Sequence, residues 1–190
     1  MQDPTRRRGR RRLEEGPALD RERLVAALLA IAEREGIAAI NMRRVAADLG
    51  VSPRLIYHHV KDKDEMLLAL FDEIWARNMP ELTGLSWQDR LREVAATSRR
   101  ALARYPGAAA AILARSTGRI TLPHSAQVRE AVEKAFSEAG FGPERIEAAC
   151  IQFVALTLGG AVMAEASSAK PRIEASIDHA LEYLFARGAD

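Results

Sequence analysis

The sequence is poor in the features that define several large protein classes. It has one cysteine, Cys150, so no internal disulfide can form, and the chain suits a reducing compartment such as the cytoplasm. No run approaches the roughly 18 consecutive apolar residues that indicate a transmembrane span. No apolar run follows the basic N-terminus, so a secretory signal is not expected either. We therefore expect a cytoplasmic protein that does not contact a membrane.

The chain also lacks the alternating apolar pattern of strands, and aromatic residues make up only 5% of it. Alanine and leucine abound, and long segments contain neither glycine nor proline. Apolar residues recur instead at helical spacing, as at Leu24, Leu28 and Ile31. Nine segments of this kind predict an all-α fold with nine helices.

Positive charge is concentrated in the first third of the chain. Residues 1–12 contain six arginines and one aspartate, and residues 41–63 contain five basic and two acidic side chains. Residues 64–190 contain 14 basic and 17 acidic side chains. This asymmetry is expected when one end of a protein meets a polyanion, although an arginine-rich arm can also serve only as a solubilising tail.

A short motif around Gly50 predicts how two helices meet. Ala46, four residues before this glycine, allows close helix crossing, and Ile56, six residues after it, can fill the angle between the helices. Val51 fills the turn. The spacing is that of a helix-turn-helix, whose second helix enters the DNA major groove. The expected helix caps are Asp20, Asn41, Ser52 and Asp62, with Pro53 at the first position of the third helix.

The predicted third helix carries side chains that suit DNA. With Leu55, Ile56 and Val60 turned inward, the outward residues are Arg54, Tyr57, His58 and Lys61. Arginine can form paired hydrogen bonds with guanine, and tyrosine and histidine can reach base edges or phosphates. Lys61 and Lys63 are placed to bind the phosphate backbone.

The stretch "INMRRVAADLGVSPRLIYHHVKDKDEMLLALFD" resembles the DNA-binding domain of the TetR (tetracycline-repressor) family. The marks are the Gly-Val turn, an aromatic in a very short helix, His-Val after it, and Lys-x-Lys before an apolar helix. The rest of the chain looks most like the subgroup with a tetracycline-repressor-like C-terminal domain. The resemblance implies that DNA is contacted by Met42, Arg43, Pro53, Arg54, Tyr57, His58, His59 and Lys63, to which we add Ser52 and Lys61.

These observations together predict a homodimeric transcriptional regulator, most simply a repressor that binds a palindromic double-stranded DNA operator and responds to a small-molecule effector. Its expected parts are a disordered basic arm (1–18), a helix-turn-helix domain (19–65) and a helical effector-binding and dimerisation domain (66–190). The candidate effector pocket comprises Trp75, Met79, Tyr105, Ile112, Phe153 and Thr157. The candidate dimer face comprises Ile151, Val154, Leu158 and Val162.

Several alternatives remain open at this point. The regulator can be an activator or independent of any ligand, and a protein that coats DNA without sequence preference would carry similar charges. An enzyme is not expected, because the sequence has no nucleophile–base pair, metal-ligand set or glycine-rich phosphate loop. We expect no cofactor and no metal: His58 and His59 are adjacent, so they point about 100° apart on a helix. His59 and Cys150 can simply be packing residues.

Deleting residues 2–12 is expected to weaken binding to all DNA sequences alike and to reduce the salt dependence of that binding. Each arginine that contacts a phosphate releases counterions, so a chain without the arm releases fewer. The measurement is the slope of log affinity against log salt concentration for both chains. An unchanged slope would show that the arm does not contact DNA.

Overall fold

The computed structural model describes residues 19–115 and 122–186, so the predicted arm at 1–18 lies outside the described residues. Within these ranges the chain forms nine α-helices and no strand, which confirms the predicted fold class. A short 3-10 helix, η1 (Ile37–Ala39), was not predicted. The α-helices are α1 (Arg21–Glu35), α2 (Met42–Leu49), α3 (Pro53–Tyr57), α4 (Lys63–Arg77), α5 (Trp87–Leu102), α6 (Ala108–Leu113), α7 (Pro123–Glu138), α8 (Pro143–Glu165) and α9 (Lys170–Ala186).

Most of the predicted caps start their helices. Asp20, Asn41 and Asp62 each accept a hydrogen bond from the amide three residues later, at 2.7, 3.0 and 2.9 Å. Ser52 is a correction, because its side chain forms no capping hydrogen bond. Its backbone carbonyl accepts the Leu55 amide at 2.9 Å instead, and Pro53 occupies the first helical position as predicted.

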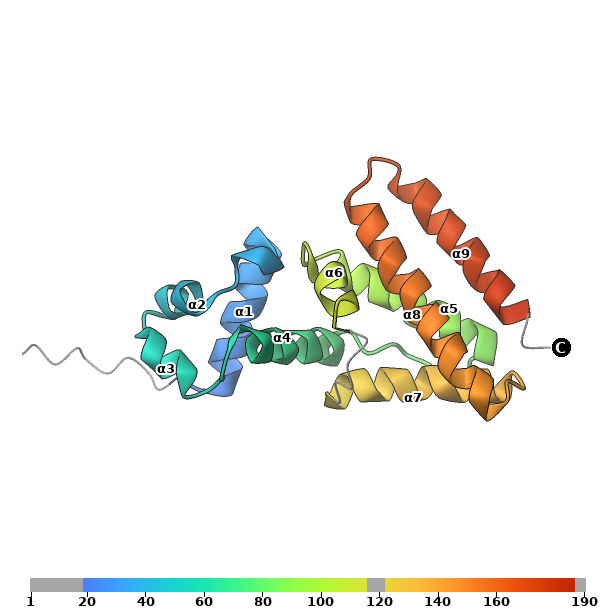
Figure 1. The fold of residues 1–190 in the computed structure, drawn as a ribbon, viewed down its shortest axis with the longest axis horizontal. Coiled ribbons are helices and arrows are strands. Elements are labelled where there is room, and N and C mark those ends of the chain that lie inside the picture. Colours follow the sequence, from blue (N-terminus) through green and yellow to red (C-terminus); the bar gives the residue numbers. More distant parts are fainter. Residues whose placement is uncertain (1–18, 116–121, 187–190) are drawn as a thin grey trace, which may run out of the picture.

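The helices form two groups along the long axis of the molecule (Figure 1). Helices α1, α2 and α3 lie at one end, α8 and α9 form an antiparallel pair toward the other, and α4 runs between them toward α7. Predicted parts 19–65 and 66–190 meet near the start of α4, so this helix belongs mainly to the second part but begins in the first.

Two apolar clusters hold the fold together, and the first of them joins the two ends. It contains the inward faces of α1, α2, α3 and α4, and also Leu102, Tyr105, Ala108, Ala109 and Leu158. The second contains the first half of α5 with α7, α8 and α9. Because Tyr105 of the α5–α6 turn and Leu158 of α8 pack into the same cluster as Ile56 and Val60, the first three helices share one core with the rest of the chain.

Helix α8 leaves much of its apolar surface uncovered. It has 23 residues, and an 18-residue window of mean hydropathy 1.7 is only 28% buried. Its length and composition would allow it to cross a bilayer, but core and interface helices of soluble proteins share these properties. Ile151 and Met163 on α8 and Tyr183 on α9 are 62%, 60% and 65% exposed. Much of this apolar surface is therefore open to solvent in the single chain.

Candidate nucleic-acid interface

The turn between α2 and α3 has the predicted helix-turn-helix geometry. Gly50 has φ 67°, in the left-handed region that favours glycine, and a Cβ added there would meet nothing within 4 Å. Its requirement is therefore conformational rather than spatial. Ala46 and Ile56 are 1% and 0% exposed, and the Val51 amide donates to the Ala46 carbonyl at 2.9 Å. The small residue, the turn glycine and the apolar plug thus meet as the sequence indicated.

Helix α3 presents the expected side chains to solvent. Arg54 and His58 are exposed, and Tyr57 is 57% exposed. Ile56 and Val60 are buried. Ser52, Pro53, Lys61 and Lys63 are also exposed, whereas Leu55, His59 and Met42 are half-buried. The half-buried position of His59 fits either a packing or a DNA-facing role. Because α3 ends at Tyr57, the two histidines belong to the turn that follows it.

Cations of this region fall into two sets, those with a carboxylate partner and those without. Among the described residues, the basic side chains that form no ion pair or hydrogen bond include Arg21, Arg43, Arg54, Lys61 and Lys63, all before residue 64. Beyond that point only Lys134 and Arg172 share this property in the described ranges. The unpaired positive charge therefore gathers around α2, α3 and the start of α4, where a phosphate can supply the missing partner.

Arg44 belongs to the other set. Its guanidinium forms a paired contact with the Glu35 carboxylate, with one nitrogen 2.6 Å from an oxygen, and lies 3.7 Å from Asp48. Arg34 completes the cluster through Glu35 at 2.7 Å and Asp48 at 3.3 Å. Arg44 and then Arg34 lower the pKa of Glu35 by hydrogen bonding, so its carboxylate stays charged. This cluster joins α1 to α2.

The N-termini of α2 and α4 are only partly satisfied. Glu65 accepts the Lys61 amide at 2.6 Å while Asp62 accepts the Glu65 amide, a reciprocal capping arrangement. The amides of Lys63 and Asp64 have no acceptor among the described residues. First-turn amides of this kind bind phosphate readily. Lys63 itself is exposed and unpaired, and its positive charge favours the same ligand.

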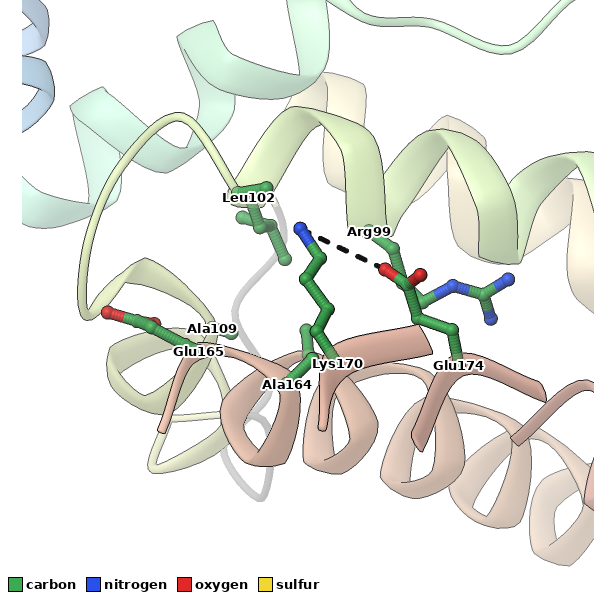
Figure 2. Close-up of a pocket in the computed structure, with 9 residues that line it drawn as sticks. Arg99, Leu102, Ala109, Ala164, Glu165, Lys170 and Glu174 are labelled. Atoms are coloured by element: carbon green, nitrogen blue, oxygen red, sulfur yellow. Dashed lines mark ion pairs between the residues drawn. The ribbon is translucent and has the colours of Figure 1, made fainter. Parts of the chain in front are cut away.

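The six expected effector residues range from buried to exposed. Trp75, Tyr105, Phe153 and Thr157 are buried, Ile112 is half-buried and Met79 is 39% exposed. None of the six residues lines either of two hollows in the described part of the chain. One of about 90 Å³ lies among α5, α6, α8 and α9 (Figure 2), and an open one of about 420 Å³ lies between residues 80–83, α5 and α7. The hydroxyl of Thr157 is nevertheless buried without a hydrogen-bond partner.

The four expected dimer residues differ in how far their side chains are exposed. Ile151 is 62% exposed, and Val154 and Val162 are half-buried. Leu158 is a correction, because it is only 5% exposed within the single chain and packs in the first apolar cluster. The helical spacing was correct, but it could not tell which side of α8 faces the core.

Cys150 and His124 lie in surroundings that account for them as packing or linking residues. Burial raises the pKa of the Cys150 thiol to about 11, which favours the protonated form at neutral pH. The amide and ring Nδ1 of His124 lie 3.0 and 3.1 Å from the Asp72 carboxylate, which ties α7 to α4. In the described ranges no three His, Cys, Asp or Glu side chains are grouped to hold a metal ion.

Comparison with known proteins gives concordant results. The sequence profile of "Bacterial regulatory proteins, tetR family" matches residues 24–70. A "HTH-type transcriptional regulator" of Saccharopolyspora erythraea is 33% identical over 176 residues, which cover 92% of this chain and 72% of that protein.

Two solved structures are also similar to the whole fold. BioQ with its double-stranded DNA operator matches with TM-score 0.78 and 26% identity, over 90% of this chain and 98% of that one. A single-substitution variant of TetR from Acinetobacter baumannii AYE, in complex with minocycline, matches with TM-score 0.75 and 26% identity, over 88% and 95% of the two chains.

Replacing Arg54 by alanine is expected to cost about 1–3 kcal/mol of DNA-binding free energy at one base position and to relax specificity there. Arg54 is exposed and unpaired on α3, so its guanidinium is available for a base edge. The measurement is selection of binding sites from random DNA with both chains. Lys134→Ala, which removes an exposed unpaired cation from α7, is the control. Identical base preferences for Arg54→Ala and the unmodified chain would contradict the assignment.

Proposed function

Because the chain belongs to the tetR family of bacterial regulatory proteins, we propose that it is a repressor that binds a palindromic operator as a homodimer. The family consists of DNA-binding transcriptional regulators rather than enzymes. The observation that carries the proposal is the unpaired cationic surface around α3. A small-molecule effector would favour a second state and release DNA from this cytoplasmic regulator.

In the proposed interface, one group of residues contacts base edges and another group binds the phosphate backbone. Arg54, Tyr57 and His58 stand where they can meet base edges in the major groove. Arg43, Lys61 and Lys63, together with the first-turn amides of α4, bind phosphates and fix the position of the protein on the duplex. Met42, Ser52, Pro53 and His59 border the same surface. Binding of BioQ to its operator by a similar fold supports this use of the helices.

Binding-site selection tests the function as a whole. A regulator retains a preferred sequence in the presence of excess competitor DNA, whereas a protein that coats DNA does not. Recovery of a palindrome with half-sites about one helical turn, roughly 34 Å, apart would support two recognition helices related by a two-fold axis. If excess competitor DNA abolished binding to every selected sequence, the proposal would be contradicted.

The exposed face of α8 suits a second copy of the same chain. Ala148, Ile151, Ala155, Gly159 and Met163 lie along one side of this helix and are exposed or half-buried. A Cβ added at Gly159 would meet nothing within 4 Å, so this glycine leaves the outer surface open for close approach. Two α8–α9 pairs packed face to face form a four-helix bundle and cover the apolar surface of both.

Replacing Ile151 by arginine is expected to convert the dimer into monomers without unfolding them. The side chain is 62% exposed in the single chain, so a charge is tolerated there but becomes buried and unpaired between two copies. Sedimentation velocity measures the change. Leu85→Arg, which places the same charge on an apolar residue 37% exposed in the loop before α5, is the control. A native chain that sediments as a monomer would overturn the dimer proposal.

The buried hydroxyl of Thr157 supports an effector site in the helical part of the chain. It is an unpartnered polar group 3% exposed inside α8, and burying such a group costs free energy unless something hydrogen-bonds to it. A polar atom of an effector can supply that bond. Trp75, Tyr105, Phe153, Ile112 and Met79 would have to separate to admit the ligand, and the minocycline complex of the Acinetobacter TetR variant supports ligand binding by a similar fold.

Replacing Thr157 by valine is expected to stabilise the ligand-free protein by about 1 kcal/mol, because it removes a buried hydroxyl that has no partner. The same change is expected to weaken the effector's release of DNA. Denaturant unfolding measures the first effect and operator binding with effector the second. Ser98→Ala is the control, since this buried hydroxyl already donates to the Val94 carbonyl at 2.6 Å. A valine variant that is destabilised as much as the control would argue against an unmet hydrogen bond.

A further inference from the structure

One peptide group connects the C-terminal end of α8 with the DNA-binding end of the chain. The carbonyl of Pro106 accepts the Ile37 amide of η1 at 2.8 Å. The amide of Gly107, which belongs to the same peptide group, donates to Glu165 Oε1 at 2.8 Å. The described chain has no cis peptide bonds, so this carbonyl and amide point in opposite directions. The result is a continuous line of hydrogen bonds from η1 through the α5–α6 turn to α8.

The backbone conformation at the two glycines beside this bridge disfavours any other residue type. Gly36 and Gly107 both have φ 82°, in the left-handed region that most side chains avoid. A Cβ at Gly36 would also lie 3.0 Å from the Pro106 carbonyl oxygen. The turn therefore approaches η1 as closely as the backbone allows. Beside it Arg104 reaches Glu33 of α1 at 3.0 Å, a second link across the same junction.

Glu165 occupies an electrostatically unfavourable position. It is the last residue of α8, and a negative charge there is repelled by the negative end of the helix dipole. In the described ranges the side chain of Glu165 forms one hydrogen bond, to the Gly107 amide. The helix dipole of α8 does not stabilise this carboxylate. The carboxylate instead binds the amide of a turn 58 residues earlier in the chain.

The space beside this contact is incompletely filled. Glu165, Ala109, Ala161 and Ala164 line the hollow of about 90 Å³ among α5, α6, α8 and α9. In Figure 2 Glu165 lies at one end with its carboxylate directed toward the loop between α5 and α6. Glu174 lies at the other end, paired with Lys170 at 3.9 Å. The end of α8 is thus held against the turn by a specific hydrogen bond in addition to the packing of α6 against α8.

We propose that Glu165 is a positioning residue for DNA binding. Through the peptide group of Pro106 and Gly107 it holds η1, and with it the connection between α1 and α2, at a fixed place relative to α8. A movement of the α8 end changes the position of α2 and α3 by the same route. The consequence for DNA rests on the proposed function, but the bridge itself can be observed without DNA.

Hydrogen exchange in the free protein tests the bridge. Glu165→Ala is expected to speed exchange of the Ile37 amide by about 2- to 10-fold, the range that corresponds to one net hydrogen bond. Glu165→Gln is expected to restore protection, because its side-chain oxygen can still accept the Gly107 amide. Glu174→Ala removes a carboxylate from the same hollow without touching the turn and is expected to leave Ile37 unchanged.

Operator affinity tests the consequence, and it is expected to fall by a similar factor in Glu165→Ala and not in Glu165→Gln. Unchanged exchange at Ile37, or an equal effect of Glu174→Ala, would overturn the bridge. Faster exchange with unaltered operator affinity would overturn the positioning role. If no operator were found, hydrogen exchange in the free protein would still show whether the bridge exists. Failure of the bridge and failure of the proposed function are therefore distinguishable.

Discussion

The outward surface of α3 depends on the burial of Ile56 and Val60. Helix α3 has five residues, far fewer than the roughly 12 that a helix needs for marginal stability in water, so it cannot maintain its shape alone. Its form is imposed by the apolar cluster beneath it, in which Ile56 is 0% and Val60 is 3% exposed. Because that cluster also contains Tyr105 and Leu158, α3 shares one core with the α5–α6 turn and with α8.

Charge pairing gives this surface its chemical character. Arg34 and Arg44 are neutralised by Glu35 and Asp48, and they bind α1 to α2. Most arginines of the later helices likewise have carboxylate partners, such as Arg92 with Glu182. Solvent-exposed pairs of this kind contribute little to stability, but they cancel the field of the charges they contain. The cations left over therefore dominate the potential that a polyanion meets.

Local sequence chemistry predicted the fold more completely than the site. Caps at Asp20, Asn41 and Asp62 and the left-handed Gly50 depend on neighbouring residues, so their pattern was sufficient. The outward direction of Arg54 and Tyr57 followed from helical spacing in the same way. The buried place of Leu158 depends on residues far away in the sequence. The pairing of Arg44 with Glu35 and of Glu165 with Gly107 depends on tertiary packing that no local pattern records.

The exposed face of α8 and the bridge at its end bear on one geometrical requirement. Two recognition helices read a palindrome only when a two-fold axis sets them about one helical turn apart, so their separation depends on how each is fixed to the dimer. If α8 forms that dimer, Glu165 lies at the end of the helix that defines the axis, one peptide group away from η1. A small shift of α8 or of the α5–α6 turn then alters the separation of both recognition helices at once. A ligand needs only to favour one position of this turn by roughly 1–3 kcal/mol to change DNA affinity about 5- to 150-fold.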